Sequence, residues 1–279
     1  MTVKAYAKIN LFLDITGRRD DGYHEISTVM HSVSLCDDIT VSKCSSTVIE
    51  CDEPSVPCDE RNTAYRCAER FFEKTGINGG AHIVIEKHIP SQAGLGGGSA
   101  DGAAVLRALN ILYGTGLSDE SLADIGALCG ADIPFCVVGG CAYCGGIGEI
   151  MTPLAVKKGI LVIAKGKDGI STGNAYSMID ALGEREHKDK QRIIADFSGE
   201  DIPRGYIYNI FEEVTDNEDV RKIKSMIAEK SIYPPLMTGS GSAVFGIFGN
   251  SEDAAEISQK LSADGYFSGV YELCGQGII

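Results

Sequence analysis

Residues 90–101 have the sequence PSQAGLGGGSAD, and this glycine-rich stretch decides how the chain folds around a ligand. The run before it, AHIVIEK over residues 81–87, predicts a strand, and residues 99–113 carry an apolar stripe that predicts a helix. Glycines let a backbone adopt positive φ angles and approach a ligand closely. The free N–H groups of a first helical turn favour an anion. This order of elements therefore predicts a cradle for nucleotide phosphates, most naturally a triphosphate.

The loop differs from the two commoner phosphate-binding motifs. No lysine follows its last glycine, so it is not a G-x-x-x-x-G-K-[ST] loop, and Gly94, Gly96 and Gly97 lack the G-x-G-x-x-G spacing. A plain flexible connection is the alternative, which the four glycines among residues 94–98 disfavour. A second cluster, TGSGS over residues 238–242, lets another backbone segment close over the site, although such turns also simply join two strands.

The composition describes a globular protein of 279 residues, long enough for one large domain or two modest ones. The formal net charge of −14 argues against a protein that binds nucleic acid duplexes, but backbone N–H groups still allow anionic small ligands. No segment reaches the roughly 20 apolar residues of a membrane-spanning helix, and no signal peptide is apparent. We therefore expect a cytoplasmic protein, monomeric or weakly homodimeric, that binds small molecules and neither nucleic acid nor membrane.

The ten cysteines are scattered, which favours free thiols in a reducing compartment. Cys141 and Cys144 have C-x-x-C spacing, but they supply two ligands where zinc usually has three or four. Their surroundings, GGCAYCGGIGE, indicate a strand between glycine turns. We expect a structural role for this pair rather than a redox or metal-binding role.

Hydrophobic patterns predict strands and helices in mixed order. The expected strands are residues 4–16, 27–35, 38–43, 81–87, 133–145, 159–164 and 269–273. The expected helices are residues 62–75, 99–113, 173–182, 188–195, 218–229 and 252–263, with another that runs from an N-cap at Ser118 through residue 129. The lack of regular βα alternation favours an α+β fold over a doubly wound sheet. A crossover near residues 151–158 divides the chain into domains 1–155 and 156–279.

Three segments together resemble the GHMP kinase superfamily and occur in its order. They are AYAKINLFLDITGRRDDGYHEI over residues 5–26, the glycine loop, and LMTGSGSAVFGIF over residues 236–248. The resemblance implies two domains, a ribosomal-protein-S5-domain-2-like N-terminal domain and a ferredoxin-like α/β-plait C-terminal domain. The first segment, with GADIPF over residues 130–135, is similar to the branch that phosphorylates 4-diphosphocytidyl-2-C-methyl-D-erythritol in the non-mevalonate route to isoprenoid precursors.

This resemblance implies transfer of the γ-phosphoryl group of ATP, with Mg²⁺, to the 2-hydroxyl of that substrate. It implies that Asp132 is the base for the hydroxyl proton and that Lys8 is its partner, because a nearby ammonium keeps a carboxylate ionised and oriented. The structural alternatives are a helix cap or turn residue for Asp132 and a surface position for Lys8. A lysine inside the apolar run YAKINLFL is nevertheless unusual.

The same resemblance implies the binding residues. ATP is expected to contact the loop residues Pro90, Ser91, Gln92, Ala93, Gly94, Leu95, Gly96, Gly97, Gly98, Ser99 and Ala100, with Asn62, Ala64 and Tyr65 bordering the adenine. The substrate is expected to contact Asn10, Tyr23, His24, Tyr176, Gly239 and Ser240. His24 is expected on one face of the pyrimidine and Tyr176 on the other. No dedicated carboxylate ligand for Mg²⁺ is evident, so Ser99 is the one candidate.

Two other functions stay open. One is another GHMP small-molecule kinase of the mevalonate or homoserine type, and the segment GYH at residues 22–24 favours the cytidylyl substrate over it. The other is a non-catalytic ligand-binding regulator of the same fold, against which the pair Lys8 and Asp132 argues.

Two positions depart from the superfamily's usual loop. Gln92 stands where the pattern Pro-x-Gly-Ala-Gly has its first glycine, and Gly102 stands where alanine is usual. Neither change removes a chemical group that the expected reaction needs. Both concern the geometry of the loop, and Gln92 is the first position to test for an altered affinity for ATP.

Overall fold

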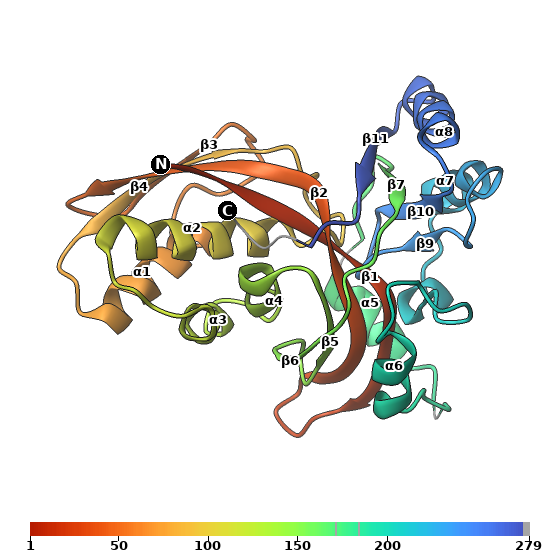
Figure 1. The fold of residues 1–279 in the computed structure, drawn as a ribbon, viewed down its shortest axis with the longest axis horizontal. Coiled ribbons are helices and arrows are strands. Elements are labelled where there is room, and N and C mark those ends of the chain that lie inside the picture. Colours follow the sequence, from red (N-terminus) through yellow and green to blue (C-terminus); the bar gives the residue numbers. More distant parts are fainter. Residues whose placement is uncertain (171, 184, 276–279) are drawn as a thin grey trace.

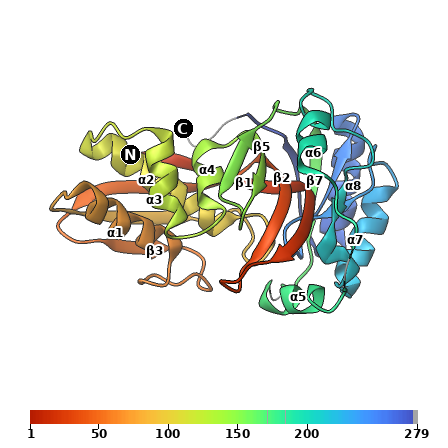
Figure 2. The same ribbon diagram turned by 90° about the horizontal axis from the view of Figure 1, so that it is seen from below.

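The structure is a computed structural model that describes residues 1–170, 172–183 and 185–275. Figure 1 shows two units side by side, each built of a sheet and the helices packed on it. The first sheet has seven strands, in the order β3 (Val48–Cys51), β4 (Gly80–Glu86), β2 (His24–Cys44), β1 (Thr2–Arg18) and β8 (Tyr208–Asn209), with β5 (Cys141–Gly145) pairing with β2 and with β6 (Ile150–Pro153). The second sheet has the order β11 (Phe267–Glu272), β7 (Ile160–Lys165), β10 (Val244–Phe248) and β9 (Leu236–Met237). Figure 2 shows the first four helices, α1 (Thr63–Thr75), α2 (Gly97–Tyr113), α3 (Asp119–Ala127) and α4 (Ile133–Val138), in one half of the molecule. The other half holds α5 (Thr172–Ile179), α6 (Lys190–Asp196), α7 (Glu218–Ala228) and α8 (Ser251–Ala263). The predicted α+β class and two-domain organisation are confirmed.

Two long antiparallel strands, β1 (Thr2–Arg18) and β2 (His24–Cys44), form the centre of the first sheet. The sequence predicted separate strands over residues 27–35 and 38–43, where β2 is one continuous strand. That interpretation was wrong. Asp37 is fully buried, and its Oδ1 accepts the backbone N–H groups of His88 and Ile89 at 2.5 and 2.7 Å. A carboxylate satisfied in this way can stay inside a strand.

Two predicted helix boundaries in the first domain, the end at Gly76 and the N-cap at Ser118, are confirmed. Helix α1 (Thr63–Thr75) begins at Asn62, whose Oδ1 accepts the N–H of Ala64, and ends at Gly76 in the left-handed conformation. Helix α2 (Gly97–Tyr113) follows β4 (Gly80–Glu86) and begins two residues before the predicted start. Helix α3 (Asp119–Ala127) has the predicted N-cap, Ser118. The strand β3 (Val48–Cys51) was not predicted.

The stretch 133–145, predicted as one strand, is instead a helix followed by a strand. Helix α4 (Ile133–Val138) has a proline in its first turn and ends at Gly139, whose φ is 71°. Strand β5 (Cys141–Gly145) then pairs with β6 (Ile150–Pro153), which was not predicted. Helix α4 and strand β5 are both largely buried and apolar, so the sequence of residues 133–145 shows neither a helical nor a strand period.

The second domain has a ferredoxin-like arrangement. Its strands are β7 (Ile160–Lys165), β9 (Leu236–Met237), β10 (Val244–Phe248) and β11 (Phe267–Glu272), and its helices are α5 (Thr172–Ile179), α6 (Lys190–Asp196), α7 (Glu218–Ala228) and α8 (Ser251–Ala263). Counted within the domain, the strand order is 4-1-3-2, and α7 and α8 pack against the sheet through one apolar cluster. The resemblance to an α/β plait is thus visible in the strand order.

The two sheets are held together by a shared apolar cluster. Ile9 and Leu11 of β1 pack in the same buried cluster as Leu161 and Phe245 of the second sheet. Strand β8 (Tyr208–Asn209), followed by the short 3-10 helix Ile210–Glu213, pairs in parallel with β1. Strand β8 comes from the predicted domain 156–279 but lies at the edge of the first sheet. The predicted domain boundary at residue 155 therefore stays a prediction. Within the described residues, no helix is both long and apolar enough to cross a membrane.

Candidate active site

The glycine loop lies over the start of α2 and lines a cavity of about 370 Å³, called here the loop pocket. Its backbone is tied to β1, because the N–H of Lys8 donates to the carbonyl of Leu95 at 2.9 Å. Gly96 precedes α2 with φ of 72°, a conformation that glycine adopts at little cost. A side chain at residue 96 would also collide with Lys8, since a Cβ there would lie 2.9 Å from Lys8 Cγ. The Lys8 side chain thus fits beside residue 96 because that residue is glycine.

Most of the expected nucleotide contacts line this pocket together. Asn62 and the ten loop residues Pro90, Ser91, Gln92, Ala93, Gly94, Leu95, Gly96, Gly97, Gly98 and Ser99 are all among its lining residues. Three expected residues are not. Ala64 and Ala100 are fully buried, and Tyr65 packs against the apolar core of the first domain. Their expected contact with ATP has no support from this arrangement.

An ion cluster beneath the loop was missed at the sequence level. Lys87 lies between Asp37 and Asp101, and its Nζ is 2.8 Å from Asp101 Oδ2. Asp101 Oδ1 has no hydrogen-bond partner among the described residues, and burial raises the pKa of this carboxyl to about 7. The sequence signal for this cluster is the presence of Asp37 and Lys87 in or next to apolar runs. Their mutual contact depends on tertiary structure, which the sequence alone does not give.

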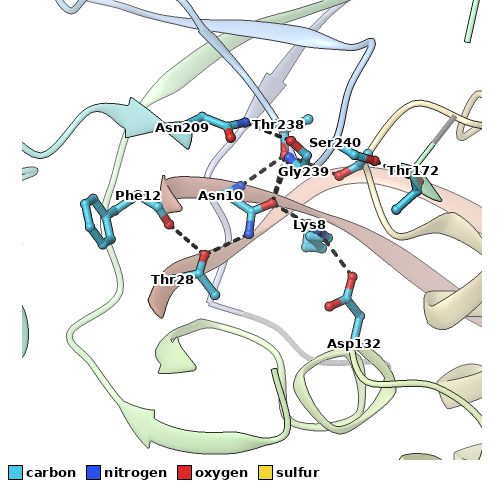
Figure 3. A network of polar contacts seen from close by, with 11 residues as sticks. Lys8, Asn10, Phe12, Thr28, Asp132, Thr172, Asn209, Thr238, Gly239 and Ser240 are labelled. Carbon is cyan, nitrogen blue, oxygen red and sulfur yellow. Dashed lines mark hydrogen bonds and ion pairs between the residues drawn. The ribbon is translucent and has the colours of Figure 1, made fainter. Parts of the chain in front are cut away.

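A second cavity of about 630 Å³, called here the Lys8 pocket, adjoins the first. Lys8 Nζ lies 3.4 Å from Asp132 Oδ2 and donates to Asn10 Oδ1 at 2.9 Å, as Figure 3 shows. The Lys8 side chain is 5% exposed and that of Asp132 is 30% exposed. Asp132 occupies the N-cap position of α4, but its side chain makes no capping hydrogen bond. Its carboxylate is thus open to a ligand in the pocket.

Asn10 joins the lysine to the second glycine cluster. Its Oδ1 accepts from Lys8 Nζ and from the N–H of Gly239 at 3.0 Å, while its Nδ2 donates to Thr28 Oγ1 at 2.8 Å. Two pure donors on Oδ1 fix the orientation of the amide. Asn10 is buried, and it lines the pocket while it positions Lys8 and the backbone of Gly239. Bulges in β1 on either side, after Tyr6 and after Asn10, aim these side chains.

Residues 238–242 pack directly on the glycine loop. Ala243 N–H donates to the carbonyl of Ala93 at 3.1 Å, and Thr238 Oγ1 donates to the carbonyl of Gly94 at 3.3 Å. A Cβ at Gly94 would lie 2.0 Å from the carbonyl oxygen of Thr238, so only glycine fits. Gly239 and Ser240, two expected substrate contacts, line the Lys8 pocket.

The aromatic residues expected at the cytidine lie differently from the expectation. His24 and Tyr176 touch each other, with ring centroids 4.7 Å apart. A ring inserted between two others needs roughly 7 Å between them, since stacked atoms lie about 3.5 Å apart. His24 Nε2 also bonds Asp180 Oδ1 at 2.6 Å. Tyr176 lines the Lys8 pocket, whereas Tyr23 is 61% exposed and lines neither pocket.

No protein cage for a metal ion is present in the described part of the chain. No group of three or more His, Cys, Asp and Glu side chains converges there. Cys141 and Cys144 are buried free thiols, and burial raises the pKa of Cys141 to about 12, so it is protonated near neutral pH. Ser99, the candidate contact for Mg²⁺, lines the loop pocket.

Comparison with known proteins places this chain among kinases. Residues 62–140 match the family described as GHMP kinases N terminal domain, and residues 214–266 match the GHMP kinases C terminal family. A relative from Caldicellulosiruptor saccharolyticus, named 4-diphosphocytidyl-2-C-methyl-D-erythritol kinase, is 41% identical over 94% of this chain and 92% of its own length. A Clostridium acetobutylicum protein of the same name is 38% identical over 95% of this chain and 96% of its own.

Solved structures agree with these relatives. A crystal structure of 4-(cytidine 5'-diphospho)-2C-methyl-D-erythritol kinase superposes with a TM-score of 0.80 at 31% identity, covering 99% of this chain and 100% of that chain. Homoserine kinase from Cytophaga hutchinsonii superposes with a TM-score of 0.69 at 17% identity, and the match covers 100% of this chain and 96% of that chain. This second match shows a shared fold alone.

Proposed function

This chain belongs to the family of 4-diphosphocytidyl-2-C-methyl-D-erythritol kinases, within the GHMP kinases, and from that premise we propose its reaction. It transfers the γ-phosphoryl group of ATP to the 2-hydroxyl of 4-diphosphocytidyl-2-C-methyl-D-erythritol, a step in isoprenoid precursor synthesis. The observation that carries this proposal is the pair Lys8 and Asp132 in a pocket that opens beside the glycine loop. The mevalonate and homoserine alternatives have only fold-level support, at 12% and 17% identity.

The acceptor side of the reaction depends on Asp132. A hydroxyl that lies in the Lys8 pocket within hydrogen-bond reach of Asp132 Oδ2 gives its proton to that carboxylate as the new O–P bond forms. The bond from the γ-phosphorus to the bridging oxygen breaks in the same displacement, and ADP leaves. Lys8 Nζ, 3.4 Å from Asp132 Oδ2, orients the carboxylate and can donate a hydrogen bond to the attacking oxygen.

The donor side depends on the glycine loop. Its backbone and the first turn of α2 present N–H groups to the triphosphate, without the lysine of a P-loop. Mg²⁺ supplies charge neutralisation to the phosphates when it is bound. Ser99 is the side chain that would hold it, and the absence of a three-residue carboxylate, thiol or imidazole group in the described residues fits an ion held mainly by phosphates and water.

The cytidine end is proposed to meet His24 and Tyr176. Because these rings already touch, a pyrimidine sandwiched between them requires the rings to part by roughly 2–3 Å. Tyr23, at the exposed turn beside His24, stays a predicted contact. The cytoplasmic location and the monomeric or weakly dimeric state also stay predictions.

Turnover of three alcohols with ATP and Mg²⁺ tests the proposal. The cytidylyl methylerythritol substrate should be phosphorylated, whereas mevalonate and homoserine should give at most a small fraction of its kcat/KM. Turnover of either alternative at a comparable kcat/KM, or none of the cytidylyl substrate, contradicts the proposed function.

A further inference from the structure

Gln92 has an unusual backbone conformation at a position where the loop could have used glycine. Its φ is 53°, and in the described part of the chain no other residue besides glycine has a positive φ. The left-handed conformation is unfavourable for an L-residue, because its Cβ lies too close to the following carbonyl oxygen. Such an outlier at a ligand loop points to a role for its side chain.

The position of Gln92 is shared by the two pockets. Of the residues that line the loop pocket, three also line the Lys8 pocket: Gln92, Gly94 and Gly96. Two of the three are glycines, so Gln92 contributes the one side chain at this boundary. A phosphoryl group that passes from a nucleotide in the loop pocket to a hydroxyl beside Asp132 in the Lys8 pocket must cross there.

The side chain of Gln92 lies next to the second domain, at Gly169. A Cβ at Gly169 would lie 2.7 Å from Gln92 Oε1 and 3.1 Å from Gln92 Cβ, so the side chain rests over the backbone of Gly169. With Oε1 against Gly169, the –NH₂ group is the end left to face a ligand. That group is also free to do so, because the Gln92 amide makes no hydrogen bond to the residues that the structure describes.

We propose that Gln92 positions the γ-phosphoryl group by donating a hydrogen bond from its –NH₂ group to a γ-phosphate oxygen. The inference rests on the proposed ATP-dependent function. Hydrogen bonds to charged groups are about twice as strong as those between neutral groups. The loop lacks a lysine after its last glycine, and the amide of Gln92 supplies a side-chain donor at the boundary between the two pockets.

Calorimetric binding of ATP and ADP to the whole protein tests this inference. Gln92→Gly, which removes the amide and fits the left-handed conformation, should weaken ATP binding about 10-fold and ADP binding less than twofold. Gln92→Glu keeps the shape but replaces a donor with an anion, so it should weaken ATP binding more than Gln92→Gly does. If Gln92 only stabilised the loop conformation, Gln92→Glu would bind ATP about as tightly as wild type, and the substitutions would change the affinities for ATP and ADP by the same factor.

A double-mutant cycle with Gly169 gives an independent readout. Gly169→Ala pushes against Gln92, so it should reduce the preference for ATP over ADP in the wild-type background and leave that preference unchanged in Gln92→Gly. Equal ATP-to-ADP affinity ratios in wild type, Gln92→Gly and Gln92→Glu overturn the inference. This binding test needs no acceptor, so failure of the proposed acceptor would show in the alcohol turnover assay and not here.

Discussion

Lys8 Nζ lies 3.4 Å from Asp132 Oδ2, although Lys8 belongs to β1 and Asp132 precedes α4. The contact is made possible by Gly96, which leaves room for the lysine stem, and by Asn10, which holds the ammonium. Asp132 has no capping bond that would compete for its carboxylate. The pair is therefore arranged for a ligand and adds little to helix stability.

Asn10→Ala should destabilise the protein and lower its turnover together. The change leaves Lys8 Nζ and the buried N–H of Gly239 without their acceptor, which we expect to lower the free energy of unfolding by about 2–4 kcal/mol. Urea unfolding and kcat measure the two effects. Asn250→Ala removes an exposed helix cap and is the matched control, with a cost of about 1 kcal/mol and unchanged kcat. Full activity in Asn10→Ala contradicts its positioning role.

Gly94→Ala should separate the two glycine clusters. Gly94 and Gly114 both have positive φ, 74° and 66°, but a Cβ meets the carbonyl oxygen of Thr238 at 2.0 Å only at residue 94, while residue 114 has nothing within 4 Å. Gly114→Ala should cost about 1 kcal/mol of unfolding free energy with normal kcat. Gly94→Ala should cost more and lose most of the turnover. Equal effects of the two substitutions would show that the clusters do not depend on this contact.

Acid should destabilise the fold through His31. Its Nδ1 lies 2.8 Å from the carbonyl oxygen of Ser32 and its Nε2 accepts the N–H of Lys157, which fixes the neutral ring, and burial lowers its pKa to about 4. The pKa of His31 in the unfolded chain is near 6.5. The contribution of its neutral ring to the free energy of unfolding is therefore fully present above pH 6.5, and about 3 kcal/mol of it is lost as the pH falls toward 4. The stability difference between wild type and His31→Gln should therefore narrow over this range. His82→Gln, which removes a histidine that contacts Glu50 at the surface, is the control variant.

Gly102→Ala should be destabilising although alanine favours helices. A Cβ at residue 102 would lie 2.8 Å from Cys67 Sγ and 3.2 Å from Thr63 Cγ2. We expect a loss of about 1–3 kcal/mol of unfolding free energy from overpacking. In a Cys67→Ala background the same change should cost at least about 1 kcal/mol less, because the sulfur is gone. A cost that is the same in both backgrounds would contradict the contact.

The sequence was sufficient for features that depend on neighbouring residues. The glycine loop, the cap of α3 at Ser118 and the end of α1 at Gly76 follow from local backbone preferences, and the structure confirms them. Helix α4 was missed because a short apolar segment that is mostly buried carries no period. The resemblance supplied the pairing of Lys8 with Asp132, which spacing alone could not.

Contacts between distant segments account for the rest of the differences. The cluster of Lys87, Asp37 and Asp101 depends on where β2, the end of β4 and α2 meet, and no local pattern encodes that meeting. The same holds for His24 and Tyr176, whose direct ring contact replaces the open sandwich expected from sequence.

The base assigned to the reaction is tested most directly by Asp132→Asn. Phosphoryl transfer from ATP to 4-diphosphocytidyl-2-C-methyl-D-erythritol should be measured in single turnover for wild type, Asp132→Asn and Asp124→Asn, an exposed aspartate on α3. We predict that Asp132→Asn lowers the transfer rate about 10²- to 10⁴-fold while the Kd for ATP changes less than threefold, and that Asp124→Asn behaves as wild type. A transfer rate in Asp132→Asn within tenfold of wild type would contradict the assignment of Asp132 as the base.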